Sequence, residues 1–193
     1  MYHLSVLARK RKKSKFAIFN DAIAIRSELD RLSMLNYYYE PKNNINNKES
    51  PEMKEARIAH ERRTVEKCSK YINDQARAAT SYITMANAIY PTNNDEMNTR
   101  RLCQDKAIAH YSVVLQEMQY MGDVANLDKN VLTKPALAID KEIGYIKNWR
   151  KSDNKIASKI EKKKSEEKQK AKLARVTSDR ENTLIKPYSF IND

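Results

Sequence analysis

The sequence predicts an all-α protein: an antiparallel, up-down four-helix bundle with a basic N-terminal arm and a C-terminal helical extension rich in Lys and Glu. Three observations support this prediction. The 193 residues include only 2 Gly and 5 Pro, whereas the turns of β and α/β proteins consume glycine. Apolar residues recur at the three-and-four spacing of one helix face in four successive stretches. The connections between the last three stretches are short, which favours antiparallel neighbours.

The first helix is predicted from Ser14 to about Leu35, because apolar residues follow one face of it. Residues 36–50 lack periodicity and contain turn-favouring residues, so they are predicted to form a loop. The predicted inward face of the first helix consists of Phe16, Phe19, Ile23, Leu29 and Leu32, with Ala22 and Ile25 filling in.

The second helix is predicted to begin at Ser50, whose hydroxyl can cap a helix that has Pro51 and Glu52 in its first turn. It extends up to Pro91, about 60 Å at 1.5 Å per residue. We expect its first part to project beyond the bundle or to fray. Its predicted inward face consists of Val65, Cys68, Ile72, Ala79, Tyr82, Ile83, Ala86 and Ile89.

The third and fourth helices follow a tight connection at residues 92–95, whose side chains can cap a helix. Gly122 lies where a helix C-cap is expected, and Pro135 is predicted either early in the fourth helix or at a kink near its start. The inward face of the third helix is predicted as Leu102, Cys103, Ala107, Tyr111, Val114, Leu115, Met118 and Met121, and that of the fourth as Leu132, Ala136, Ile139, Ile143, Ile146 and Trp149.

The net charge of +12 is concentrated at the two ends of the chain. We divide the chain into a basic arm (1–15), a four-helix bundle (16–150), and a charged helical extension with a flexible tail (151–193). The arm holds six basic residues and no acid, and the last segment twelve basic and seven acidic residues. The bundle is nearly neutral, with nineteen basic and eighteen acidic residues. The two ends are therefore the parts predicted to seek a polyanion.

No motif for nucleotide hydrolysis, zinc chemistry or acyl transfer occurs, so we predict a protein that is not an enzyme and has no cofactor and no metal. A metal-dependent bundle enzyme remains an alternative that requires bound metal. The absence of a long apolar run predicts no membrane span and no signal peptide. Two cysteines, Cys68 and Cys103, are expected to pack in a reducing cytoplasm. The three dispersed histidines (His3, His60, His110) are expected to have ordinary surface or helix-packing roles. Four carboxylates are expected on solvated helix faces: Glu117, Asp123, Asp140 and Glu142.

Candidate nucleic-acid-binding residues are clustered cations, because phosphate binding requires positive charge within reach of a polyanion. A merely solubilising arm and ordinary solvated helix faces are the alternatives. The tyrosines at 37–39 offer rings that can stack on unpaired bases, or that pack against protein. The candidate cations are Arg9, Lys10, Arg11, Lys12, Lys13 and Lys15 in the arm, Arg100, Arg101 and Lys106 on the third helix, and Lys147, Arg150 and Lys151 on the fourth.

Three stretches resemble the accessory variability determinant proteins of diversity-generating retroelements. Residues 5–7 (Ser-Val-Leu) precede the basic run and the Ser-Lys-Phe of residues 14–16. Residues 86–92 read Ala-Asn-Ala-Ile-Tyr-Pro-Thr, with Arg-Arg at 100–101 and Gln-Asp-Lys-Ala at 104–107. Residues 146–154 read Ile-Lys-Asn-Trp-Arg-Lys-Ser-Asp-Asn. The resemblance covers about residues 1–155 and does not reach the extension.

This resemblance implies a four-helix bundle that assembles into a pentamer, binds a reverse transcriptase and engages its structured template RNA. The protein would support mutagenic cDNA synthesis and mutagenic retrohoming while the polymerase supplies the chemistry. The other function we consider is a phage or bacterial structural or adaptor bundle whose basic ends bind an acidic protein partner. A neighbouring reverse transcriptase gene would favour the first function.

Overall fold

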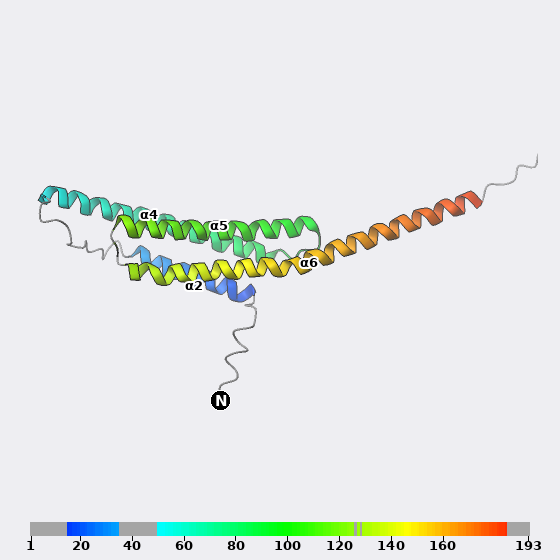
Figure 1. Cartoon of the computed structure of the whole chain (residues 1–193), viewed down its shortest axis with the longest axis horizontal. Helices are drawn as coiled ribbons and strands as arrows, with labels where there is room; N and C mark the ends of the chain where they lie inside the picture. Colours follow the sequence, from blue (N-terminus) through cyan, green and yellow to red (C-terminus); the bar gives the residue numbers. More distant parts are fainter. Residues whose placement is uncertain (1–14, 35–49, 126, 128, 185–193) are drawn as a thin grey trace, which may run out of the picture.

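The computed structural model describes residues 15–34, 50–125, 127 and 129–184. Four helices make up this part of the chain: α2 (Lys15–Ser33), α4 (Pro51–Ala88), α5 (Asn94–Val124) and α6 (Lys129–Leu184). Each helix packs against two others, in the ring α2–α4–α5–α6. Successive helices run in opposite directions, and the second half of α6 leaves the bundle as a single helix (Figure 1). The predicted all-α four-helix bundle is therefore confirmed.

Local capping explains where α4 and α5 begin. The Ser50 hydroxyl accepts a hydrogen bond from the Met53 N–H (3.3 Å), with Pro51 in the first turn, as predicted. At α5, the Asn93 side chain accepts from the Glu96 N–H (2.9 Å), and the Glu96 carboxylate accepts from the Thr92 N–H (2.7 Å). These reciprocal bonds satisfy donors that a helix start leaves unpaired. Hydrogen bonds from Thr92 and Asn93 lower the pKa of Glu96 below its ordinary value.

The first turns of α4 project past the end of the bundle (Figure 1). Residues 51–56 are exposed, yet the helix is continuous from Pro51. The expected projection is therefore observed, without fraying.

The core runs along the seam between the four helices, and its largest member in α5 is Tyr111. The predicted face of α2 was wrong at one position: Ile23 is 47% exposed, while Ile18 is buried. Positions 18, 22, 25, 29 and 32 alternate steps of four and three, and Ile23 lies about 100° away from this stripe. In α5, Leu102 is likewise 54% exposed.

Gly122 does not end α5, contrary to the prediction. The helix continues to Val124, and Ala125 is the C-cap. Gly122 is buried inside the helix, where an added Cβ would lie 3.1 Å from Leu132 Cδ1. The glycine therefore permits close packing of α5 against α6 rather than a turn.

Helix α6 passes through the predicted boundary at 150–151 without a break and includes Pro135 near its start. Asp153, beyond that boundary, is 1% exposed and belongs to the packed part of the molecule. The helix also extends to Leu184, so residues 176–184 are helical and not part of a flexible tail.

Candidate nucleic-acid interface

Arg100 was predicted to lie on a basic surface, and this prediction was wrong. Its side chain is 1% exposed. Its Nε lies 2.9 Å from Asp153 Oδ2, and its guanidinium also donates to Asp153 Oδ1 (3.0 Å) and to the Ile89 carbonyl (3.0 Å). Gln104 donates to Asp153 Oδ2 (2.9 Å), and the Trp149 ring centroid lies 5.0 Å from the guanidinium carbon.

This Arg100 cluster joins three parts of the chain: the end of α4, the first turns of α5 and the point where α6 leaves the bundle. A buried charge is costly unless it is paired and hydrogen-bonded. The planar guanidinium meets that requirement by facing the carboxylate with two nitrogens and stacking near an indole ring. Arg100 therefore holds the helices together and does not face a ligand.

Arg101 and Arg150 lie nearer the surface but have protein partners. Arg101 donates to the Asn154 amide oxygen (2.6 Å), and Arg150 forms an exposed ion pair with Asp105. Both contacts cross from α5 to α6 beside the Arg100 cluster. Exposed ion pairs contribute little stability, so these arginines can exchange partners for a phosphate at small cost.

Lys106, Lys147 and Lys151 are exposed, as a phosphate-binding surface requires. Lys147 and Lys151 lie one turn apart on α6. The Lys106 ammonium lies 5.1 Å from the centroid of the Tyr82 ring, which stacks on His110 (centroids 5.4 Å apart, 13° between planes).

Most of the net positive charge of the described residues lies on the extension of α6, where the sequence predicted no site residue. Residues 155–175 hold nine Lys or Arg and three Glu, and from Glu161 to Thr177 every side chain is exposed. The three acids concealed this signal. The sequence nevertheless indicates a cationic surface here, because residues 155–175 have an excess of six positive charges and no wide apolar face.

The remaining candidate residues cannot be placed. Arg9, Lys10, Arg11, Lys12 and Lys13 lie outside the described residues, as do the side chain of Lys15 and the tyrosines at 37–39.

The bundle interior contains one carboxylate that was expected to be solvated. Glu142 is 1% exposed, so that expectation was wrong. Burial raises the pKa of Tyr111 well above its ordinary value, the negative charge of Glu142 adds to this effect, and the nearby Thr80 side chain opposes it. These groups lie inside the packed bundle and have no open site around them.

Within the described ranges, no group of three or more His, Cys, Asp or Glu side chains could hold a metal ion. Cys68 and Cys103 are buried free thiols. Burial raises the pKa of Cys68, and the negative charge of Glu117 raises it further. No helix among the described residues is long and apolar enough to cross a membrane.

No family model matches the chain, and no curated protein or solved structure matches it.

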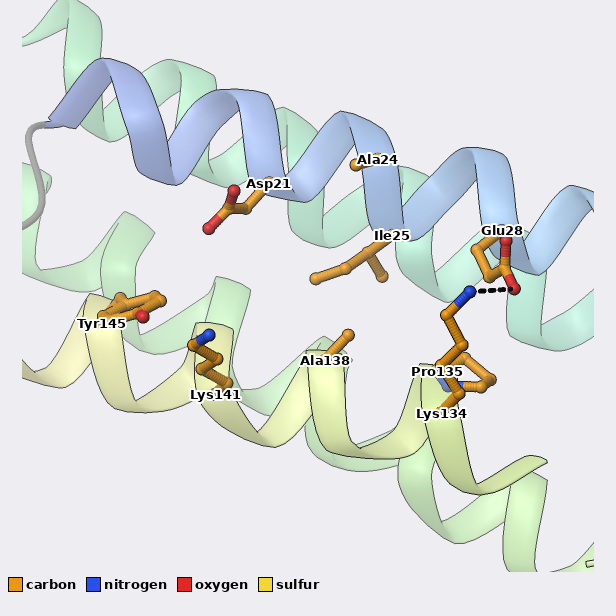
Figure 2. A pocket seen from close by; sticks show the side chains of 9 residues that line it. All are labelled: Asp21, Ala24, Ile25, Glu28, Lys134, Pro135, Ala138, Lys141 and Tyr145. Carbon is orange, nitrogen blue, oxygen red and sulfur yellow. Dashed lines mark ion pairs between the residues drawn. The ribbon is translucent and has the colours of Figure 1, made fainter. Parts of the chain in front are cut away.

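A groove of about 370 Å³ lies between α2 and α6 (Figure 2). Asp21 and Glu28 of α2 face Lys134 and Lys141 of α6, and the Lys134 ammonium lies 3.8 Å from Glu28 Oε1. The two acids and two lysines balance, so the groove is not part of the cationic surface. The apolar part of its wall consists of Ala24, Ile25, Pro135 and Ala138.

Proposed function

We propose that this chain is a non-catalytic accessory protein that binds a retroelement reverse transcriptase and its structured template RNA, and so supports mutagenic cDNA synthesis in the cytoplasm. The resemblance in residues 1–155 supports a homo-oligomer, with a pentamer as the expected form. The polymerase supplies the chemistry, and this chain supplies binding surfaces.

The observation that carries this proposal is the exposed positive charge where α6 leaves the bundle. Lys147 and Lys151 are exposed there, one turn apart on α6, and Lys106 is exposed on α5, where it faces Tyr82 of α4. Clustered cations bind a phosphate backbone by releasing its counterions, which makes the affinity fall as salt rises. A scaffold of this kind can hold an RNA against a polymerase without any catalytic group of its own.

The proposal is tested by co-expressing the chain with a reverse transcriptase from a neighbouring gene and its template RNA. We expect RNA-dependent co-purification and cDNA synthesis that requires this protein. Changing Lys106, Lys147 and Lys151 together to Gln should lower RNA affinity about tenfold or more and reduce the salt slope by about two to three.

The matched control changes Lys54, Lys67 and Lys70 of α4, which are exposed elsewhere on the bundle, to Gln. This control removes the same charge and should retain wild-type cDNA yield. If the folded protein neither associates with the polymerase and RNA nor affects cDNA yield, the accessory role is rejected in favour of an adaptor that binds an acidic protein.

A further inference from the structure

The extension of α6 over residues 155–175, here called the α6 rod, is an isolated cationic helix. At 1.5 Å per residue it is about 31 Å long. It carries nine basic and three acidic residues. It leaves the bundle as a single helix, with Ile156, Ala157 and Ile160 half-buried near its start and every side chain from Glu161 exposed (Figure 1). A helix with so little apolar surface and so much charge of one sign is suited to contact a polyanion.

The cations of the α6 rod form two rows on opposite sides of the helix. With about 100° per residue, the first row spans an arc of about 100° and the second an arc of about 80°, and their centres lie about 190° apart. The first row consists of Lys155, Lys159, Lys162, Lys163 and Lys170, and the second of Lys164, Lys168, Lys172 and Arg175.

The two edges between these rows carry no cation. One edge presents Ser158, Ser165 and Gln169, which are small or uncharged polar residues. The hydroxyls of Ser158 and Ser165 donate to backbone carbonyls of their own helix, so both side chains lie close to its surface. The other edge combines Ile156, Ile160, Ala171 and Ala174 with Glu167.

The second row is the more available of the two. Lys162 and Lys163 of the first row lie 3.9 Å from the carboxylates of Glu166 and Glu167, respectively. Glu161 lies within the arc of the second row, but among the described residues no ion pair joins it or another acid to the cations of this row. Exposed ion pairs at this distance contribute little to stability. Lys162 and Lys163 can therefore exchange their glutamate partners for a phosphate.

Two cationic rows fit a ligand that presents a phosphate backbone on each side of the helix. A helix with its side chains is about 10–12 Å wide, and the major groove of B-form DNA is about 12 Å wide. The major groove of A-form RNA is deep and narrow and does not admit a helix in this way. A flat acidic surface or a single strand would engage only one row.

We propose that the α6 rod docks in the major groove of double-stranded DNA, with one cationic row against each backbone and the Ser158, Ser165 and Gln169 edge toward the bases. Lysine acts as a point charge on phosphate, so binding is sequence-independent and salt-dependent. Just before the start of the α6 rod, Trp149 and Asp153 contact Arg100 and hold this part of α6 in the Arg100 cluster. This site goes beyond the proposed function, which concerns RNA and a polymerase.

The test measures fluorescence anisotropy of the full chain with four oligonucleotides of 20 base pairs or 20 nucleotides: duplex DNA, duplex RNA, single-stranded DNA and single-stranded RNA. Two row variants change four cations each to Gln, which preserves helix propensity. One carries Lys155, Lys159, Lys163 and Lys170→Gln, and the other Lys164, Lys168, Lys172 and Arg175→Gln. The control carries Lys54, Lys67, Lys70 and Arg77→Gln, all exposed on α4, and circular dichroism checks that helix content is retained.

We expect each row variant to lose about tenfold or more in affinity for duplex DNA and about three to four in salt slope, and to keep nearly wild-type affinity for duplex RNA and for the single strands. The α4 control should stay near wild type. An equal loss of affinity for duplex RNA or for a single strand in the row variants, a loss from one row only, or equal displacement of DNA by polyglutamate would overturn the proposal. Because the accessory role is tested with Lys106, Lys147 and Lys151 through cDNA synthesis, the two proposals fail separately.

Discussion

At the scale of single residues, the Arg100 cluster determines how α5 and α6 are joined. The buried charges of Arg100 and Asp153 form an ion pair, with 2.9 Å between Arg100 Nε and Asp153 Oδ2. Removing one partner would leave the other charged and desolvated. Replacing both with apolar residues of similar volume would leave no uncompensated charge, and such replacements are often neutral or stabilising.

We therefore expect Arg100→Met to lower the free energy of unfolding by about 3–5 kcal/mol. The double variant Arg100→Met with Asp153→Leu should recover most of that loss. Urea denaturation followed by circular dichroism measures both, with Arg101→Gln as a control near the surface. Equal losses in the single and double variants would contradict the paired-charge argument.

Tyr111 makes the free energy of unfolding of the bundle fall at alkaline pH. Its pKa is raised in the folded protein, mainly by burial, so the unfolded chain loses this proton first as the pH rises past about 10. The unfolded state then binds fewer protons than the folded state, and the free energy of unfolding falls with rising pH. The Tyr111→Phe variant should show a shallower decline than wild type when urea denaturation is measured between pH 9 and 11. Parallel curves for the two proteins would refute this assignment.

At the scale of helices, the caps of α4 and α5 have unequal importance. Both side chains satisfy a backbone N–H at a helix start, but α4 begins in exposed turns that project from the bundle, whereas α5 begins beside the Arg100 cluster. Loss of a cap at a projecting end can be absorbed by local fraying, while loss at a packed end acts on the whole fold.

Asn93→Ala should therefore reduce the global free energy of unfolding by about 1 kcal/mol. Ser50→Ala should leave the denaturation midpoint nearly unchanged and accelerate amide hydrogen exchange in the first turns of α4. The comparison fails if both variants shift the midpoint equally.

At the scale of the whole molecule, the bundle and the α6 rod have separate sources of stability. Side chains from Glu161 to Thr177 are all exposed, so the bundle buries nothing against them. Ending the chain after Ile160 should change the free energy of unfolding by no more than about 0.5 kcal/mol, while the helical circular dichroism signal falls. Ending it after Asn148 removes Trp149 and Asp153, leaves Arg100 unpaired and should cost several kcal/mol. A large loss in the first truncation would show that the α6 rod contacts the bundle.

The four helices were predictable because their determinants are local. Periodic apolar residues, the scarcity of glycine and the capping side chains of Ser50 and residues 92–95 act within a few residues of one another. The short connections between the last three helices predicted that neighbouring helices run antiparallel. The proposed phosphate-binding surface was predicted only in part: Lys106, Lys147 and Lys151 are exposed, whereas the charge excess of the extension was underestimated.

The fold class, the helix start at Pro51, a capped connection near residues 92–95 and the cationic character of the C-terminal segment could therefore be derived from the sequence alone. Which polar and apolar residues are buried could be read only from the packed helices. Arg100 and Asp153 are 53 positions apart, and neither residue type alone predicts burial. The same holds for Glu142 in the core and for the choice of Ile18 over Ile23 in α2. Burial depends on which partner the packed helices bring opposite each side chain, and that information is not local in the chain.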